Sequence, residues 1–179
     1  MKVFSFCSIV ALLVLAGSLS SVGQFERLPH ETYRLEWPTA ENWKIGNRQE
    51  NDQMLRVDMV REPEAQIGES VTLLSYKGVQ KMDVENVMRA IHQEYLKECY
   101  SAHITVVDKN IDAEYPWIIF TMECKVFDNG EPGTSQVWQI IQGKFALYTL
   151  YREFKSAPSL EDIQNTAKLF KTGRVTYSD

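Results

Sequence analysis

Apolar and polar residues alternate along most of this chain, which predicts a protein built mainly from β-strands. In residues 53–62, for example, Leu55, Val57 and Met59 lie on one face and Arg56 lies on the other. Residues that favour turns separate several of the alternating segments. Strands are therefore expected over residues 32–37, 53–62, 70–77, 102–107, 115–127, 135–142 and 144–154, with a short last strand over 175–177.

Two segments have the helical spacing of apolar residues instead. The first begins after Asp83, a residue type that caps helix N-termini. Its apolar stripe consists of Val84, Val87, Met88, Ile91, Tyr95 and Cys99. The second begins after Ser159, which forms a variant of the capping box with Asp162, and Gly173 follows its end. The stripe of this second helix consists of Leu160, Ile163, Ala167 and Phe170.

The order of these elements predicts an α+β fold in one domain. Tight turns at 128–130 and 142–143 join consecutive strands, and such turns favour antiparallel pairing. Residues 117–119 and 135–142 are apolar on both faces, so the middle of the sheet needs cover on both sides. We expect a mostly antiparallel sheet of about six or seven strands with a helix on each face, an α/β/α sandwich.

The two ends of this pattern resemble a known family. Residues 33–38 (YRLEWP), followed by the Asn-Trp pair at 42–43, resemble the opening of the PsbP-like fold. The hairpin across Gly143, the strand over 146–154, the Ala-Pro-Ser segment at 157–159 and the last helix are similar to PsbP and to DcrB-like envelope proteins. The resemblance extends in element order over nearly all of the chain after the first segment. It implies a PsbP-like sandwich and a non-enzymatic binding or assembly role, with no catalytic residue carried over.

The first segment has the pattern of a secretory signal peptide. Lys2 precedes an apolar run over 3–16, which at 14 residues is shorter than the roughly 20 that span a membrane. An uncleaved signal anchor is the alternative, and Ser18 stands where a lipidated cysteine would be needed. Cleavage is expected after one of three small residues, Ser18, Ser20 or Gly23. We therefore expect a signal peptide over 1–23, a single domain over 24–179 and export to the periplasm or the extracellular space.

Export changes the interpretation of the cysteines. Removal of residues 1–23 would remove Cys7 and leave Cys99 and Cys124. In an oxidising compartment a disulfide between them is the expected state. Cys99 ends a helical stripe and Cys124 lies on the apolar face of a strand, positions that suit a bridge. Two buried free thiols are the alternative, and a catalytic Cys99 with His103 is a further one.

The sequence offers no metal, cofactor or catalytic motif. None of its three histidines stands at metal-ligand spacing with another. Residues 108–112 supply oxygen ligands like a calcium loop, but Ala113 and Ile119 stand where glycine and glutamate are needed, so a polar loop is expected. Glu161 and Asp162 belong to the first turn of a helix, where the helix dipole favours acids. We expect no cofactor and no enzyme.

Abundant aromatic residues provide the candidates for partner binding. Trp138 is the candidate, because Gln136 and Gln142 lie on the same face of its strand. A core position for Trp138 is the alternative. The net charge of −5 argues against nonspecific nucleic-acid binding, and no membrane span is expected after the signal peptide.

The resulting hypothesis is an exported, soluble, non-enzymatic binding or assembly factor of the cell envelope that acts through a protein partner. An inhibitor or immunity protein is one form of it, since an acidic protein can be steered onto a basic target. Two alternatives stay open. One is a small secreted hydrolase whose residues meet only in the fold. The other is a carrier of a small apolar ligand, held between the sheet and a helix.

Overall fold

The computed structural model shows an α+β fold of nine strands and two helices over the part of the chain that it describes. The described residues are 30–37, 42–61, 70–154 and 157–178. The expected signal peptide, with its cleavage positions, lies outside them. The strands are β1 (His30–Arg34), β2 (Trp43–Glu50), β3 (Met54–Arg61), β4 (Ser70–Lys77), β5 (His103–Asn110), β6 (Trp117–Glu123), β7 (Ser135–Gln142), β8 (Ala146–Phe154) and β9 (Arg174–Ser178). The helices are α2 (Val84–Tyr95) and α3 (Leu160–Lys171).

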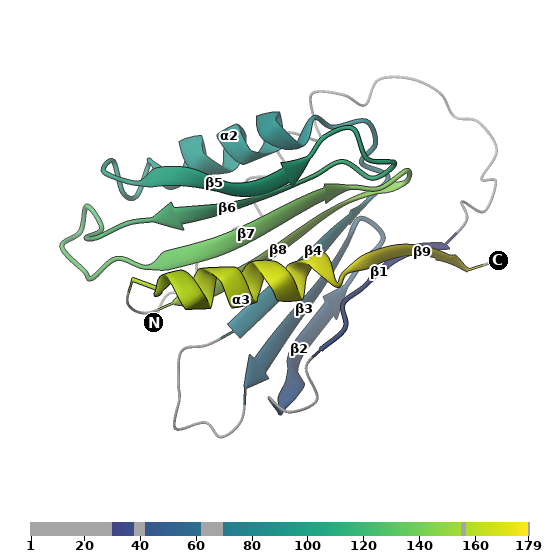
Figure 1. Ribbon diagram of the computed structural model, residues 1–179, viewed down its shortest axis with the longest axis horizontal. Coiled ribbons are helices and arrows are strands. Elements are labelled where there is room, and N and C mark those ends of the chain that lie inside the picture. The colour runs from purple at the N-terminus through teal and green to yellow at the C-terminus, as the bar shows by residue number, and fades with distance from the viewer. Residues whose placement is uncertain (1–29, 38–41, 62–69, 155–156, 179) are drawn as a thin grey trace.

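Seven strands form one antiparallel sheet in the order β2-β3-β4-β8-β7-β6-β5 (Figure 1). This confirms the expected antiparallel pairing. The strands expected over 70–77 and 135–142 have the predicted bounds. The first expected strand does not join this sheet. It forms β1, which pairs with β9 in a separate two-stranded sheet, with Tyr33 opposite Val175. We call this β1–β9 pair the ribbon.

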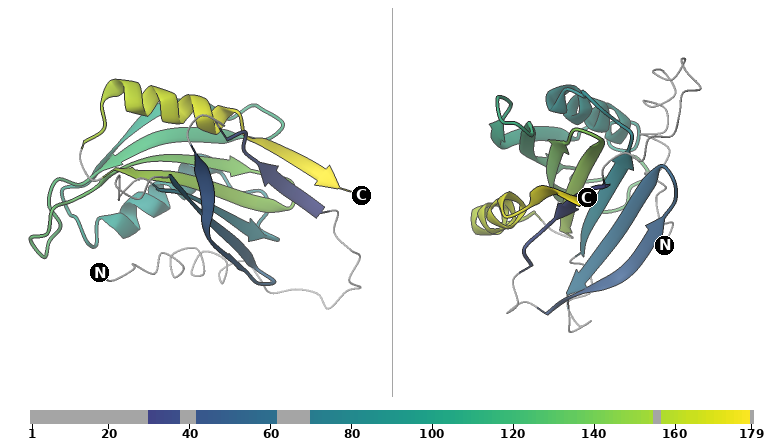
Figure 2. Two further views of the ribbon diagram at one scale, coloured as in Figure 1. Left: turned by 90° about the horizontal axis from the view of Figure 1, so that it is seen from below. Right: turned by 90° about the vertical axis from the view of Figure 1, so that its right-hand side faces the viewer.

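The two helices lie on opposite faces of the sheet and cover its middle strands (Figure 2). On one face, α2 packs with the side chains of Ile118, Phe120 and Trp138. On the other, α3 packs with those of Ile119 and Val137. Neighbouring residues of a strand therefore belong to two separate cores, because successive side chains point to opposite faces. The predicted capping box of α3 is present.

The strand that the sequence pattern did not predict is β2, at the edge of the sheet. Only Trp43 is half-buried, and the other seven residues of β2 are exposed. Its sequence, WKIGNRQE, has no alternation because only Trp43 packs against a core and the rest of the strand is exposed on both faces. Figure 2 shows β2 and β3 extending away from the two helices. Helix cover therefore belongs to the β6–β8 half of the sheet, and this end is more open than expected.

The segment around residues 102–127 also differs from its prediction. The strand expected to stop at Val107 continues to Asn110, because a bulge between Val106 and Asp108 keeps it paired with β6. The expected polar loop at 108–112 is therefore strand as far as Asn110. The next strand is shorter than predicted: β6 ends at Glu123, four residues before the expected end.

A disulfide joins Cys99, just after α2, to Cys124, just after β6, with 6.2 Å between their Cα atoms. The predicted pairing is thereby confirmed. It ties α2 to the sheet, and both cysteines are buried. A structural disulfide is typical of an oxidising compartment. Within the described ranges, no helix combines the length and the hydropathy that crossing a membrane requires.

Glu31 fastens the ribbon to the hairpin between β7 and β8. Its carboxylate accepts hydrogen bonds from three backbone amides and two tyrosines: Lys144 N (2.7 Å), Phe145 N (3.2 Å), Ala146 N (3.1 Å), Tyr148 Oη (3.2 Å) and Tyr177 Oη (2.8 Å). The hairpin comes so close that a Cβ on Gly143 would lie 2.1 Å from Glu31 Oε1. Glu31 thus determines where the ribbon lies relative to the sheet.

Candidate ligand pocket

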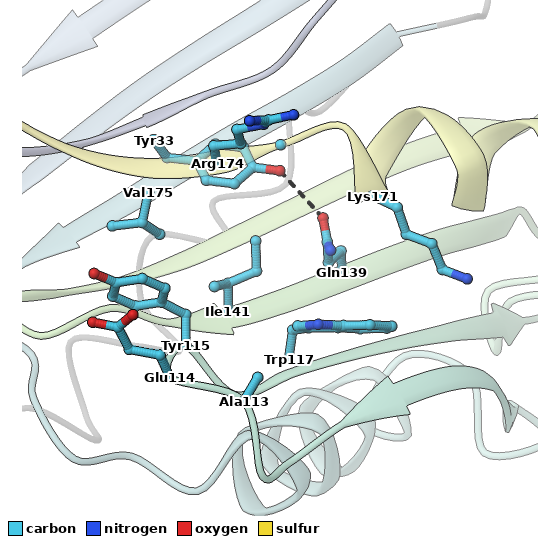
Figure 3. A pocket seen from close by; sticks show the side chains of 11 residues that line it. Tyr33, Ala113, Glu114, Tyr115, Trp117, Gln139, Ile141, Lys171, Arg174 and Val175 are labelled. Carbon is cyan, nitrogen blue, oxygen red and sulfur yellow. Dashed lines mark hydrogen bonds between the residues drawn. The ribbon is translucent and has the colours of Figure 1, made fainter.

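A pocket of about 540 Å³ lies on the α3 side of the sheet, between the ribbon, the end of α3 and the loop before β6 (Figure 3). Its lining comes from elements that are far apart in sequence. The lining residues are Tyr33, Ala113, Glu114, Tyr115, Trp117, Gln139, Ile141, Lys171, Gly173, Arg174 and Val175. The volume is in the range typical of small-molecule sites, about 300–1,000 Å³.

Strand pairing places the apolar walls of the pocket. Tyr33 and Val175 are opposite each other in the ribbon, so they share a face. Trp117 and Ile141 are opposite each other on β6 and β7. Tyr115 completes the wall from the loop before β6, and its hydroxyl donates to that of Tyr177 in β9 at 3.2 Å. The pocket therefore offers aromatic and branched aliphatic surfaces to a ligand.

Gln139 is the buried polar group of the pocket. It is 3% exposed and lies on the same strand face as Ile141. The Tyr33 hydroxyl lies 3.3 Å from Gln139 Oε1 and 3.2 Å from the Phe170 carbonyl oxygen (Figure 3). A phenol has one proton, so it donates to one acceptor at a time. Among the described residues, Gln139 Nε2 has no hydrogen-bond partner, and its amide keeps bonding capacity for a ligand.

Tyr33 is held as a neutral phenol inside this wall. Burial raises the pKa of its hydroxyl well above the usual value. Gly173 leaves the space that the ring occupies, because a Cβ there would lie 1.5 Å from Tyr33 Oη. Gly173 follows the cap residue Thr172, as the sequence indicated. Its φ is not in the left-handed region, so close approach, rather than a strained turn, is the reason for glycine here.

Replacement of Gly173 by alanine should lower the free energy of unfolding by about 1–3 kcal/mol, the usual cost of overpacking. The added methyl group has to displace the Tyr33 ring, which comes from the other end of the chain. Urea denaturation measures the change. The double variant with Tyr33→Leu removes the clash and should lose less than the sum of the two single changes. Additive losses would contradict the contact.

The rim of the pocket carries charged groups, most of which are paired. Lys171 Nζ donates to Asp108 and lies 5.7 Å from the centre of the Trp117 ring. This ammonium holds the pKa of the Asp108 carboxyl below its usual value. The Glu114 carboxylate pairs with Lys144 Nζ at 2.8 Å, and that contact lowers the pKa of Glu114.

The residues predicted to bind a partner lie elsewhere, in the core on the α2 side. Trp138 is 2% exposed and stacks on Tyr151 at 4.5 Å between ring centres. Its indole N–H donates to Gln136 Oε1 at 2.8 Å. Gln142 is also buried, where it accepts from Met82 N and donates to the Val79 carbonyl oxygen. This arrangement corresponds to the core alternative for Trp138.

The other candidates of the sequence analysis do not converge on the pocket. His92 Nε2 lies 3.0 Å from the Ala102 carbonyl oxygen, and His103 pairs with Glu123 on β6. The Asp108 of the calcium-like segment contacts Lys171, so a cation already occupies that carboxylate. Asp162 accepts from Ser159 in the capping box. No cluster of three or more metal-ligating side chains occurs in the described part of the chain.

Sequence reasoning did not identify the pocket residues, although one signal was present. Gln139 interrupts an otherwise apolar strand face between Val137 and Ile141, which marks a buried polar group that needs a partner. Tyr33, Tyr115 and Arg174 carried no comparable signal, because the folding of the ribbon onto the sheet is what brings them together.

Comparison with known proteins identifies no family, since neither a protein-family model nor a curated protein matches the chain.

Proposed function

We propose that this chain is a non-enzymatic binding protein of an oxidising compartment, and that it holds a small apolar ligand in the pocket between the ribbon and the sheet. The observation that carries the proposal is the pocket itself. Its walls are aromatic and aliphatic, and one buried amide, that of Gln139, lies among them. Mostly apolar walls with a few placed polar groups are typical of small-molecule sites.

The chemistry of the lining favours binding over catalysis. None of the lining residues is a serine, cysteine or histidine. Glu114 supplies the carboxylate of the lining. It is paired with Lys144 and is exposed to solvent, so it is not enclosed in a site from which water is excluded. Burial keeps the Tyr33 hydroxyl protonated. A hydrolase needs a nucleophile and a base within hydrogen-bond reach of each other, and these residues do not supply them.

Among the forms of binding that the sequence suggested, the carrier of a small ligand has the most support. The version with a protein partner relied on Trp138, Gln136 and Gln142, whose side chains are buried. The proposal keeps export to the cell envelope, which the disulfide supports. It also keeps a relationship to the PsbP/DcrB-like proteins, supported by an antiparallel sheet with one helix on each face.

The uncharged dye N-phenyl-1-naphthylamine tests the proposal, because its emission rises in an apolar site. We expect saturable binding to the purified, oxidised protein. Ala113→Phe fills the pocket from its loop and should weaken binding roughly tenfold or more, the effect of losing one good apolar contact surface. Ala157→Phe is the matched control, since it adds the same ring to an exposed residue at the other end of α3.

Dye binding that is absent, or equally strong in Ala113→Phe and Ala157→Phe, would contradict the proposal. Circular dichroism melts of both variants check that they fold. A variant that melts like the parent protein yet binds less dye supports occupation of the pocket.

A further inference from the structure

The ribbon has a second face, which points away from the pocket. Tyr33 and Val175 line the pocket, and successive side chains of a strand point to opposite faces. Arg34 and Arg174, the neighbours of these residues, therefore lie on the other side, directly opposite each other in the strand pair. Both are exposed, and Figure 3 shows the Arg174 guanidinium pointing away from Ile141. We call this side the outer face of the ribbon.

The two arginines of the outer face have no counter-ion among the residues that the structure describes. Neither guanidinium forms an ion pair there, although Glu36 follows Arg34 by two residues. The neighbouring hydroxyls of Thr32 and Thr176 bond to each other at 3.0 Å. Like charges at directly opposite positions of an antiparallel pair destabilise it. Arg34 and Arg174 thus lower the stability of the ribbon and stay available to an external anion.

The backbone of the ribbon also has hydrogen-bonding groups to spare. The ribbon is a separate two-stranded sheet, so each of its strands has a partner strand on one side only. Within the described ranges, no backbone hydrogen bond joins the outer edges of β1 and β9 to another segment. Such edges accept a further strand from another chain, and a two-stranded sheet gains stability from a third strand.

The arginine pair and the free edges fit the same kind of partner. Guanidinium groups favour carboxylates, and free strand edges favour an extended backbone. We propose that the ribbon docks an extended acidic segment of a partner protein, which adds as a third strand and places carboxylates beside Arg34 and Arg174. An anionic bilayer would use the arginines but not the backbone groups, and the net charge of −5 opposes its approach.

A fluorescent peptide in which glutamate and threonine alternate tests this proposal, because all of its glutamates lie on one face of a strand. We expect saturable binding to the purified, oxidised protein by fluorescence anisotropy, and much weaker binding of the same peptide with glutamine in place of glutamate. Arg34→Gln and Arg174→Gln should each weaken binding roughly threefold, and the double variant roughly tenfold, as for exposed charge pairs. Neither change should lower the Tm, because each removes a like-charge repulsion.

Lys168→Gln is the matched control, since it removes an exposed cation of α3 that also lacks an ion pair in the described part of the chain. This variant should bind the peptide like the parent protein. Equal binding by the parent protein and the double arginine variant would overturn the proposal. Equally tight binding of a peptide N-methylated at every residue would do so too, because that peptide keeps its charges but cannot pair as a strand. Arginine-dependent binding of phosphatidylglycerol vesicles without any peptide binding would assign the outer face to a lipid surface instead.

Discussion

Replacement of both Cys99 and Cys124 with alanine should lower the free energy of unfolding by about 3.5 kcal/mol, the chain-entropy value for a loop of about 26 residues. The bridge closes a loop that contains β5 and β6, and it joins the segment just after α2 to the residue just after β6. Without it, the unfolded chain gains conformations while the folded contacts stay largely the same. For a domain of this size the loss corresponds to about 7–14 °C in Tm.

Thermal melts of the oxidised protein, the double variant and the parent protein in reductant measure the effect. The reduced parent protein should melt close to the double variant, because both lack the same crosslink. Lys125→Ala, which alters the exposed residue after Cys124 and leaves both sulfur atoms in place, serves as the control. A double variant as stable as the oxidised parent protein would show that the bridge does not constrain the unfolded chain.

The second large effect is expected for Glu31→Ala, which should cost about 2–4 kcal/mol of stability. Three backbone amides and two tyrosine hydroxyls would lose their shared acceptor. Hydrogen bonds to a charged group are worth more than neutral ones, while water that reaches this half-buried site offsets part of the loss. Because the ribbon is a wall of the pocket, dye binding should weaken as well.

Glu36→Ala is the matched control for this change, since Glu36 is exposed and follows β1 in the same segment. Chemical denaturation of both variants gives the comparison. Glu31→Gln separates charge from shape, because the amide keeps one acceptor oxygen but presents N–H groups to backbone donors. Equal stability of Glu31→Ala and Glu36→Ala would mean that the ribbon is held by other contacts.

The sequence predicts those parts of the fold in which a regular pattern of apolar and polar residues corresponds to a uniform pattern of burial. The strand over 135–142 was predicted with its observed bounds because apolar residues on both of its faces meet a helix-covered core. The edge strand β2 was missed because exposed residues follow no alternation. The end of β5 was misplaced because a bulge at Val106 shifts which residues face the partner strand.

The pocket could not be predicted in the same way, because it depends on contacts across the whole chain. Tyr33 and Gln139 are 106 positions apart in the sequence. Glu31 accepts hydrogen bonds from backbone amides more than 110 positions away. The periodic spacing of apolar residues within one strand or helix says nothing about contacts between residues so far apart. The disulfide was predictable because its two cysteines had no other partner in the expected mature chain.

The pairing of β1 with β9 has a consequence for the biogenesis of the protein. One strand of the ribbon is among the first described residues to be synthesised, and the other is among the last. A chain that emerges from the ribosome has β1 without its paired strand until β9 has been synthesised. The pocket is therefore completed only once β9 is present, so a chain that stops before β9 lacks one of the pocket walls.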